Sequence, residues 1–260
     1  MVHEMKISSW NDLNNFIEKS SPNHLDTLLN HTIFRGQSNY EWKLETSLSR
    51  IVNGSSLSEQ KAKFYEKQAQ MDFISQAHTT NEKISFDSSP MSLDVIMQHY
   101  SCPTRLLDWS ESPYIALYFA INNSFHTDGA FYAWDDRFYQ KRMKHKYENY
   151  SSIKGSDIIN FLDYEIVQIV QSTRKNERLI RQQGIFSVSN NLIKNHCDLI
   201  DSEKKESSGL YKIKIPKELK FEFLARLRKM NITAESLFPG LDGIGKSISE
   251  KLVLRRWLEK

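Results

Sequence analysis

The sequence of 260 residues contains only two cysteines, Cys102 and Cys197. Two cysteines cannot build a disulfide framework, which excludes the small disulfide-stabilised secreted domains. No apolar run reaches the roughly 18 residues that a membrane-spanning helix needs. The first ten residues are broken by His, Glu, Lys and Ser, unlike the apolar part of a secretory signal. We therefore expect a reduced, soluble protein of the cytoplasm without membrane contact.

A large excess of one charge is also missing. The net charge of +3 is the balance of 35 basic and 32 acidic side chains, too small to indicate nucleic-acid binding by itself. Basic side chains do cluster between Arg137 and Lys146, and a solvated surface segment is the common explanation for such a run. Aromatic residues, by contrast, make up 12% of the chain. They supply enough apolar area to build a packed core.

The order of hydrophobic patterns indicates one domain over residues 1–260, because repeats, low-complexity tracts and linkers are all missing. The fold class expected is α+β, with a small, split, mixed or antiparallel sheet flanked by helices. Predicted strands begin at Thr32 and cover residues 129–134, 184–188 and 210–215. Predicted helices cover residues 9–30, packed on the rest, and residues 91–100, 156–173 and a segment after Pro216. Ser112-Pro113 is a strong start signal for a helix that is apolar on every side and therefore buried.

Two further helices have a predicted inward face. After the Ser56/Glu59 capping pattern, the expected buried residues are Phe64, Met71 and Ile74. In the last helix, which follows a Thr233 cap and the Pro239-Gly240 interruption, an apolar stripe is formed by Leu241, Ile244, Ile248 and Leu252.

The segment Gln98–Trp109 concentrates polar side chains directly before the apolar helix. It contains His99, Tyr100, Thr104, Arg105 and Asp108. A helix N-terminus presents free N–H groups that suit an anion, and an arginine beside it adds a fork suited to phosphate or carboxylate. Each residue alone has a structural explanation, such as an Arg105–Asp108 pair or a hydrogen-bonded core histidine. Together they indicate a site, because burying so many polar groups is costly without a ligand.

A second polar group lies at Arg35-Gly36-Gln37, after the short apolar run 32–34. The glycine permits backbone geometry that a side chain would forbid, so the strand is expected to end in a turn here. Arginine and backbone could then approach a ligand together. We predict that Arg35 and the 99–108 segment meet around one concave, positively charged site.

Five ordered motifs resemble the FRG-domain family. They are FRG at 34–36, QHYxxPTRLLDW at 98–109, ALYFA at 116–120, RxxxQxGxF at 178–186 and LFPGLDGI at 237–244. The resemblance extends over roughly residues 33–248, and ordered motifs are more specific than a tripeptide. The sequence departs from the family at Ser101-Cys102, where Gly and an aliphatic residue are usual, and at Thr46, where Pro is common. These departures concern the shape of the local turns.

The resemblance leaves the activity to be inferred, and the first hypothesis is an enzyme that consumes NAD. An aromatic-Arg-Gly strand end is similar to the first motif of arginine-type ADP-ribosyltransferases, which would make the fold ADP-ribosyltransferase-like. The expected catalytic residues are His99, Tyr100, Asp108 and Gln182. The expected residues for NAD binding are Arg35, Gly36, Gln37, Thr104, Arg105 and Trp109, with no metal. Those enzymes have a late glutamate where this chain has Gln182-Gln183-Gly184, and only Glu165 and Glu177 lie near it in sequence. Family members often occur near defence genes, which implies a toxin or phage-defence role.

Two other classes of function stay open. The same pocket could recognise a nucleotide or another phosphorylated small molecule without chemistry, which needs no glutamate. Alternatively, the 137–146 run could contact nucleic acid with His99 as a general acid–base. The small net charge and the lack of metal-ligand spacing count against that third class.

Overall fold

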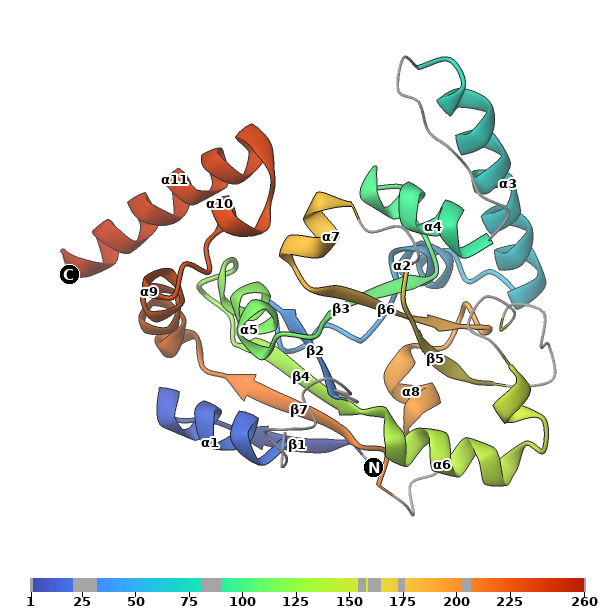
Figure 1. Ribbon diagram of the computed structural model, residues 1–260, viewed down its shortest axis with the longest axis horizontal. Coiled ribbons are helices and arrows are strands. Elements are labelled where there is room, and N and C mark those ends of the chain that lie inside the picture. Colours follow the sequence, from blue (N-terminus) through green and yellow to red (C-terminus); the bar gives the residue numbers. More distant parts are fainter. Residues whose placement is uncertain are drawn as a thin grey trace.

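The computed structural model describes residues 2–20, 32–80, 90–153, 158, 165–172, 176–202 and 207–259. Figure 1 shows a seven-stranded sheet with helices on both faces. The strands are β1 (His3–Lys6), β2 (Thr32–Gln37), β3 (Leu106–Ser110), β4 (Gly129–Asp135), β5 (Val167–Val170), β6 (Gly184–Ser189) and β7 (Leu210–Ile215). Their order across the sheet is β1-β7-β4-β2-β3-β6-β5, and only the β1–β7 pair is parallel. The mixed sheet flanked by helices confirms the expected fold class.

The sheet nearly separates between β2 and β3. β2 pairs with β4 over six residues and β3 pairs with β6 over five, whereas β2 and β3 share only the pair Phe34↔Ser110. One half of the sheet is therefore β1-β7-β4-β2 and the other is β3-β6-β5. Backbone groups of β2 and β3 beyond the shared pair need partners other than a ladder. This opening is where the polar motifs meet.

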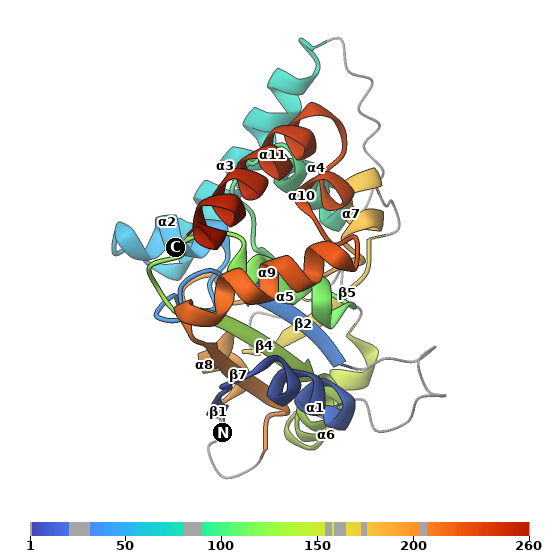
Figure 2. The same ribbon diagram turned by 90° about the vertical axis from the view of Figure 1, so that its left-hand side faces the viewer.

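One face of the sheet is covered by helices that are largely apolar toward it. They are α1 (Trp10–Ser20), α5 (Pro113–Ile121), α9 (Lys220–Lys229), α10 (Ala234–Leu237) and α11 (Gly240–Leu258). Figure 2, turned toward this side, shows α1, α5 and α9 in front of the strands. Ser112 caps α5 by accepting a hydrogen bond from the Ile115 N–H, and α5 is buried on nearly every side, as its sequence predicts.

The remaining helices cover the other face and the upper edge in Figure 1. They are α2 (Ser47–Gly54), α3 (Glu59–Ala77), α4 (Pro90–His99), α6 (Asp136–Lys146), α7 (Glu177–Arg181) and α8 (His196–Ile200), with short 3₁₀ turns at Tyr150–Ser152 and Lys217–Leu219. Trp109 and Trp134 pack together in this second core, with ring centroids 5.8 Å apart. Among the described residues, no helix is long and apolar enough to cross a membrane.

The predicted inward face of α3 is wrong. Phe64 and Met71 are 59% and 56% exposed, while the helix buries Ala62 and Glu66 instead. A buried glutamate needs a partner, and Arg105 supplies it. The orientation of α3 is therefore set by this ion pair and not by an apolar face.

The predicted stripe of α11 also faces outward, with Leu241 85% and Leu252 59% exposed. The helix is instead attached through a polar residue, Glu250, which accepts hydrogen bonds from the Tyr118 hydroxyl and the Ala234 N–H. Gly243 lies against the Phe238 carbonyl, where a Cβ would come within 2.0 Å. Close packing at this glycine and the buried glutamate fix the orientation of α11.

Two segments differ from their predicted form. Residues 156–173 were expected to be helical, but Val167–Val170 is a strand, because β6 offers it an antiparallel partner. Other residues of that segment lie outside the described ranges, as do residues 21–30 of the predicted first helix, whose described part ends at Ser20. Strands at 129–134, 184–188 and 210–215, the helix after Pro216 and the Thr233 cap are confirmed.

A lysine at the start of α9 is fully buried. The Lys220 ammonium donates to the carbonyls of Ser38, Asn123 and Ser124 at 2.7, 3.1 and 3.0 Å. It thereby joins the segment after β2 to the end of α5. Three carbonyl acceptors supply what water would otherwise give a buried ammonium.

We expect Lys220→Met to lower the free energy of unfolding by about 2–4 kcal/mol, because three carbonyls lose a charged donor, and only those of Ser38 and Ser124 keep another one, from Thr127, while the replacement keeps the apolar stem. Urea denaturation monitored by circular dichroism measures the loss. Lys229→Met, at an exposed position of the same helix, is the control and should change stability by less than about 0.5 kcal/mol. Equal midpoints for the two variants would contradict this assignment.

Candidate functional site

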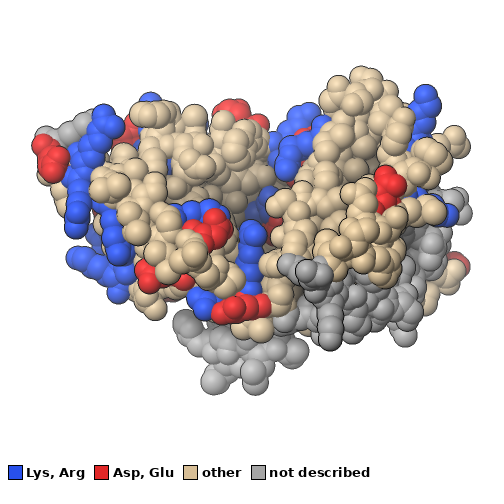
Figure 3. All heavy atoms as spheres, turned by 90° about the horizontal axis from the view of Figure 1, so that it is seen from above, with Lys and Arg blue, Asp and Glu red and all other residues tan. Residues whose placement is uncertain are grey.

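A cavity of about 340 Å³ lies where β2 and β3 separate. Its walls come from β2, β3, α4, α5 and α7, and its apolar lining includes Phe34, Phe119 and Phe186. Figure 3 shows a hollow in the face that α4, α7 and α11 surround, with basic side chains near its centre. Polar and aromatic groups thus converge in one concavity, the usual form of a small-molecule site.

Arg35 bridges the opening in the sheet. Its Nη1 donates a hydrogen bond to the main-chain carbonyl of Asp108 on β3. In a continuous sheet, a backbone N–H of β2 would serve this carbonyl, so the guanidinium replaces a ladder bond. Its Nε is buried and has no hydrogen-bond partner in the described structure. Burial lowers the pKa of Arg35, an effect that the nearby Asp108 opposes.

Asp108 presents the acidic side chain of the cavity. Its side chain is exposed, whereas the neighbouring side chains of Leu107 and Trp109, which lie on the other face of the strand, are buried. Its Oδ1 accepts a hydrogen bond from Nε2 of Gln98 at 2.7 Å. Gln98 in turn accepts from the Thr104 hydroxyl. Thr104 is therefore buried behind the cavity wall and not in it, contrary to the expectation that it contacts a ligand.

His99 is the last residue of α4 and Tyr100 follows it; their rings pack edge to face, 4.9 Å apart, but they line different concavities. His99 lines the cavity, whereas Tyr100 borders a separate apolar groove with Phe73 of α3, their rings 6.4 Å apart. The turn that follows has Ser101 at φ 63°, a conformation that favours glycine, which accounts for the glycine usual in the family here. Tyr100 therefore does not line the cavity that contains His99.

The α7 wall contributes Arg178 and Gln182. The Arg178 guanidinium lies 5.1 Å from the ring centroid of Phe238, an aromatic residue of the LFPGLDGI motif. Gln182 lines the cavity, but its Nε2 donates to the Leu237 carbonyl at 3.1 Å. Its neighbour Arg181 donates to the preceding two carbonyls of α10. These bonds attach α10 to α7, which explains structurally why the two motifs occur together.

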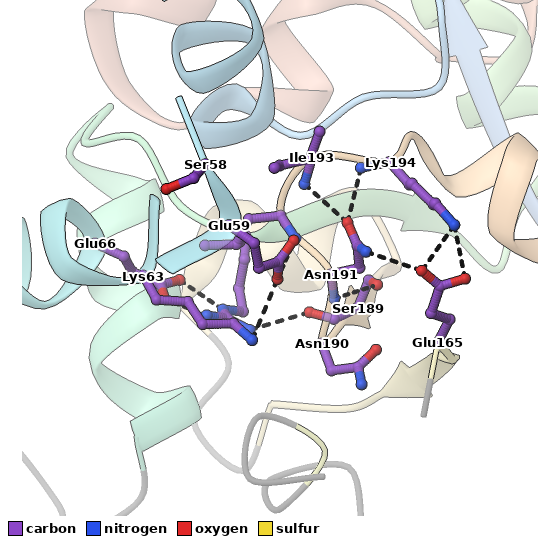
Figure 4. A network of polar contacts seen from close by, with 12 residues as sticks. Ser58, Glu59, Lys63, Glu66, Glu165, Ser189, Asn190, Asn191, Ile193 and Lys194 are labelled. Carbon is purple, nitrogen blue, oxygen red and sulfur yellow. Dashed lines mark hydrogen bonds and ion pairs between the residues drawn. The ribbon is translucent and has the colours of Figure 1, made fainter. Parts of the chain in front are cut away.

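Arg105 was expected to bind pyrophosphate, and its position contradicts this. It is 1% exposed, its Nε and Nη2 bind the Glu66 carboxylate, and its Nη1 donates to the Ser189 carbonyl at 3.1 Å. Figure 4 shows Glu66 and Ser189 within this network, far along the chain from one another. With its donors used inside the protein, Arg105 joins α3 to the end of β6. The pair with Asp108 that could have explained Arg105 structurally is replaced by the pair with Glu66.

Trp109 lines the cavity, but its indole N–H already makes a hydrogen bond inside the protein. The indole Nε1 donates to Ser187 Oγ at 2.7 Å, and that hydroxyl lies 2.9 Å from Nδ1 of His196. The hydroxyl can donate its own proton to a neutral imidazole or accept one from Nδ1, because its oxygen has a second lone pair, so the direction of this bond depends on the tautomer of His196. Burial, with a contribution from Arg35, lowers the pKa of His196 to about 3.

Gly36, Gln37 and the α5 N-terminus differ from their expected geometry. Gly36 is within β2, and a Cβ there would lie 1.9 Å from the Ala116 carbonyl, so this glycine lets α5 rest on the strand. Gln37 is buried and donates to the Lys43 carbonyl at 3.2 Å. At the start of α5, the N–H of the cap residue Ser112 donates to Ser110 Oγ, and the Ile115 N–H donates to Ser112 Oγ. The cavity meets the side of this helix at Ala116 and Phe119 instead.

The structure adds residues that sequence reasoning left out of the site: Gln98, Arg178 and Phe119. The first two open the QHY and RxxxQ motifs, so motif membership was the signal that could have found them. Phe119 looked like any other residue of a buried helix. Within the described ranges, no cluster of three His, Cys, Asp or Glu side chains could hold a metal ion.

Residues 30–129 match the model of the FRG domain, which supports the resemblance that the motifs indicate. The matched region includes Arg35, the 98–109 motif and α5, whereas Arg178 and Gln182 lie after it. Comparisons with curated proteins and with solved structures find no match.

The buried His196 makes stability depend on pH. The pKa of His196 in the folded protein, about 3, lies below the ordinary value of 6.5. Between these two pH values the unfolded chain therefore binds a proton at His196 and the folded protein does not. The contribution of the neutral His196 to the free energy of unfolding is complete above pH 6.5 and is lost as the pH falls toward 3. We expect His196→Gln to flatten the acid destabilisation by up to about 1.4 kcal/mol per pH unit. Urea midpoints measured from pH 7 to pH 4 provide the test.

The matched control for this measurement is His126→Gln, at an exposed position. It should retain the wild-type pH dependence. A His196→Gln protein with the same slope as wild type would show that the imidazole is not held neutral.

Proposed function

We propose that the cavity binds a nucleotide and that this FRG protein consumes NAD as an ADP-ribosyltransferase-like enzyme. The observation that carries the proposal is the meeting of Arg35 and Asp108 in the opening between β2 and β3. A fixed cation and a carboxylate there adjoin aromatic walls. A nucleoside diphosphate has the corresponding parts, namely phosphates, a ribose and a base that stacks.

In this proposal Arg35 and Arg178 bind the phosphates, since planar guanidinium groups suit phosphate oxygens. The bond from ribose C1′ to the nicotinamide nitrogen breaks, and its electron pair leaves with nicotinamide. Positive charge then develops on the ribose, and the Asp108 carboxylate stabilises it. His99 takes the proton of the attacking water or target side chain. Asp108 thus supplies the charge that Gln182 cannot.

The expected late glutamate has no equivalent in the cavity lining. Glu165 forms an ion pair with Lys194 (Figure 4), and Glu177 pairs with Arg181. Asp108 is the acidic residue that lines the cavity in the described part of the chain. NAD consumption in the cytoplasm would deplete a shared cofactor, which supports a toxin or phage-defence role.

A second candidate is a sensor that binds the same nucleotide without chemistry. The observation in its favour is that the cavity lining has Gln182 in the region where arginine-type ADP-ribosyltransferases have a glutamate, and binding alone needs no such glutamate. Nucleic-acid binding has less support, because the 137–146 run is no continuous basic face: Arg142 is buried and Arg137 pairs with Asp135. Its helix, α6, lies at the opposite end of the molecule from α4 and α7 (Figures 1 and 2).

Incubation with NAD and chromatography of released nicotinamide tests the enzyme directly. We expect wild type to release nicotinamide, and Asp108→Asn to lower kcat by about 100-fold or more with KM nearly unchanged, because the lost charge acts in the transition state. This variant keeps the main-chain carbonyl that Arg35 uses. Arg178→Ala should raise KM, and Arg256→Ala, at an exposed arginine of α11, is the control.

The melting temperature with NAD or ADP-ribose separates the two candidates. Nicotinamide release that depends on Asp108 supports the enzyme. A rise in melting temperature without turnover, lost in Arg178→Ala, supports the sensor. If NAD is not turned over and the melting temperature does not change, both candidate functions are contradicted.

A further inference from the structure

The carboxylate of Asp108 is held by a chain of hydrogen bonds whose direction is determined at each step. The Leu106 N–H donates to Thr104 Oγ1 at 3.3 Å. The Thr104 hydroxyl donates to Gln98 Oε1. Gln98 Nε2 then donates to Asp108 Oδ1 at 2.7 Å. The chain begins at a backbone N–H that cannot accept and ends at a carboxylate that cannot donate.

These two ends settle which way the Gln98 amide faces. An ionised carboxylate accepts only, so the amide NH₂ must face Asp108. The Thr104 oxygen already accepts from Leu106, and its single proton is therefore available to the amide carbonyl. With the amide reversed, its oxygen would face the carboxylate and its NH₂ would face the threonine oxygen. The contact with Asp108 would then set two acceptors against each other, and this decides the orientation of the amide.

Thr104 is itself fixed in place. It is 1% exposed, its N–H donates to Ser47 Oγ at 3.0 Å, and Ser47 Oγ donates to its carbonyl at 3.3 Å. Ser47 begins α2, so the N-terminus of this helix anchors the start of β3. Packing and main-chain bonds thus hold the threonine hydroxyl at one point behind the cavity wall.

We propose that Gln98 is a positioning residue that holds the Asp108 carboxylate in its working orientation, and that Thr104 sets the orientation of Gln98. This rests on the proposed function, in which Asp108 stabilises the charge developing on the ribose. A carboxylate on an exposed strand position would otherwise sample several rotamers, and fixing it before reaction lowers the activation barrier. Thr104, expected from sequence to touch the ligand, acts instead through Gln98.

A set of near-isosteric variants tests the proposal in the NAD assay. We expect Gln98→Met to lower kcat by about 10- to 100-fold, a range typical of groups that orient a functional ligand, with KM within about 3-fold. Thr104→Val removes the hydroxyl and should lower kcat in the same direction, whereas Thr104→Ser restores it and should return kcat to within about 2-fold of wild type.

A double-mutant cycle shows whether Gln98 acts through Asp108. In the Asp108→Asn background, Gln98→Met should change kcat by less than about 2-fold, since the group that it positions has lost its charge. Additive losses, or a rise in KM with unchanged kcat, would overturn the proposal and indicate that Gln98 contacts the substrate. Melting temperatures of all variants identify any that are simply unfolded.

A measurement without substrate keeps this proposal separate from the proposed function. In the resting protein, the side-chain NH₂ of Gln98 should give an NMR signal protected from exchange. The protection should be lost in Asp108→Ala and in Thr104→Val and kept in Thr104→Ser. If wild type releases no nicotinamide, the proposed enzymatic function is contradicted. The exchange protection of the Gln98 signal still tests whether Gln98 positions Asp108. An amide signal unaffected by Asp108→Ala would refute it.

Discussion

The hydrogen bond from the Arg35 guanidinium to the Asp108 carbonyl is the interaction on which the site depends. It replaces a ladder bond where β2 and β3 diverge, and so keeps two halves of a sheet together without closing the space between them. A backbone N–H in the same place would draw the strands together. A long cationic side chain keeps them apart and brings a positive charge to the opening.

Much of the surrounding structure can be understood as support for this opening. Gly36 lets α5 rest directly on β2, so that one wall is rigid. Arg105 and Glu66 hold α3 against the end of β6 behind the site. Gln182 and Arg181 attach α10 to α7 across its rim. Several of the motif residues therefore build the cavity, and fewer of them remain to bind a ligand.

The fold could be predicted from sequence where the signal was local. The Ser112-Pro113 cap, the buried α5 and the strands at 129–134 and 210–215 depend on residues close in the chain. The outward stripe of α11 could not be predicted, because its orientation depends on a buried glutamate that meets Tyr118 over a hundred positions away. Strand β5 likewise depends on a partner that periodicity cannot reveal.

The site was predictable as a meeting of motifs and less so residue by residue. Arg35, His99, Asp108 and Gln182 do share one cavity, but Arg105 and Thr104 belong to its supporting structure. Sequence alone shows that an arginine and a threonine are present; it does not show whether a buried glutamate or glutamine has already taken their hydrogen bonds. Arg178 could be assigned to the site only from the fold, which places α7 in the cavity wall.

The most direct test of the central claim is a crystal structure of the protein with ADP-ribose bound. We expect phosphate oxygens at about 3 Å from the guanidinium of Arg35 or Arg178, inside the opening between β2 and β3. Ligand density elsewhere, with this opening filled only by water, would contradict it.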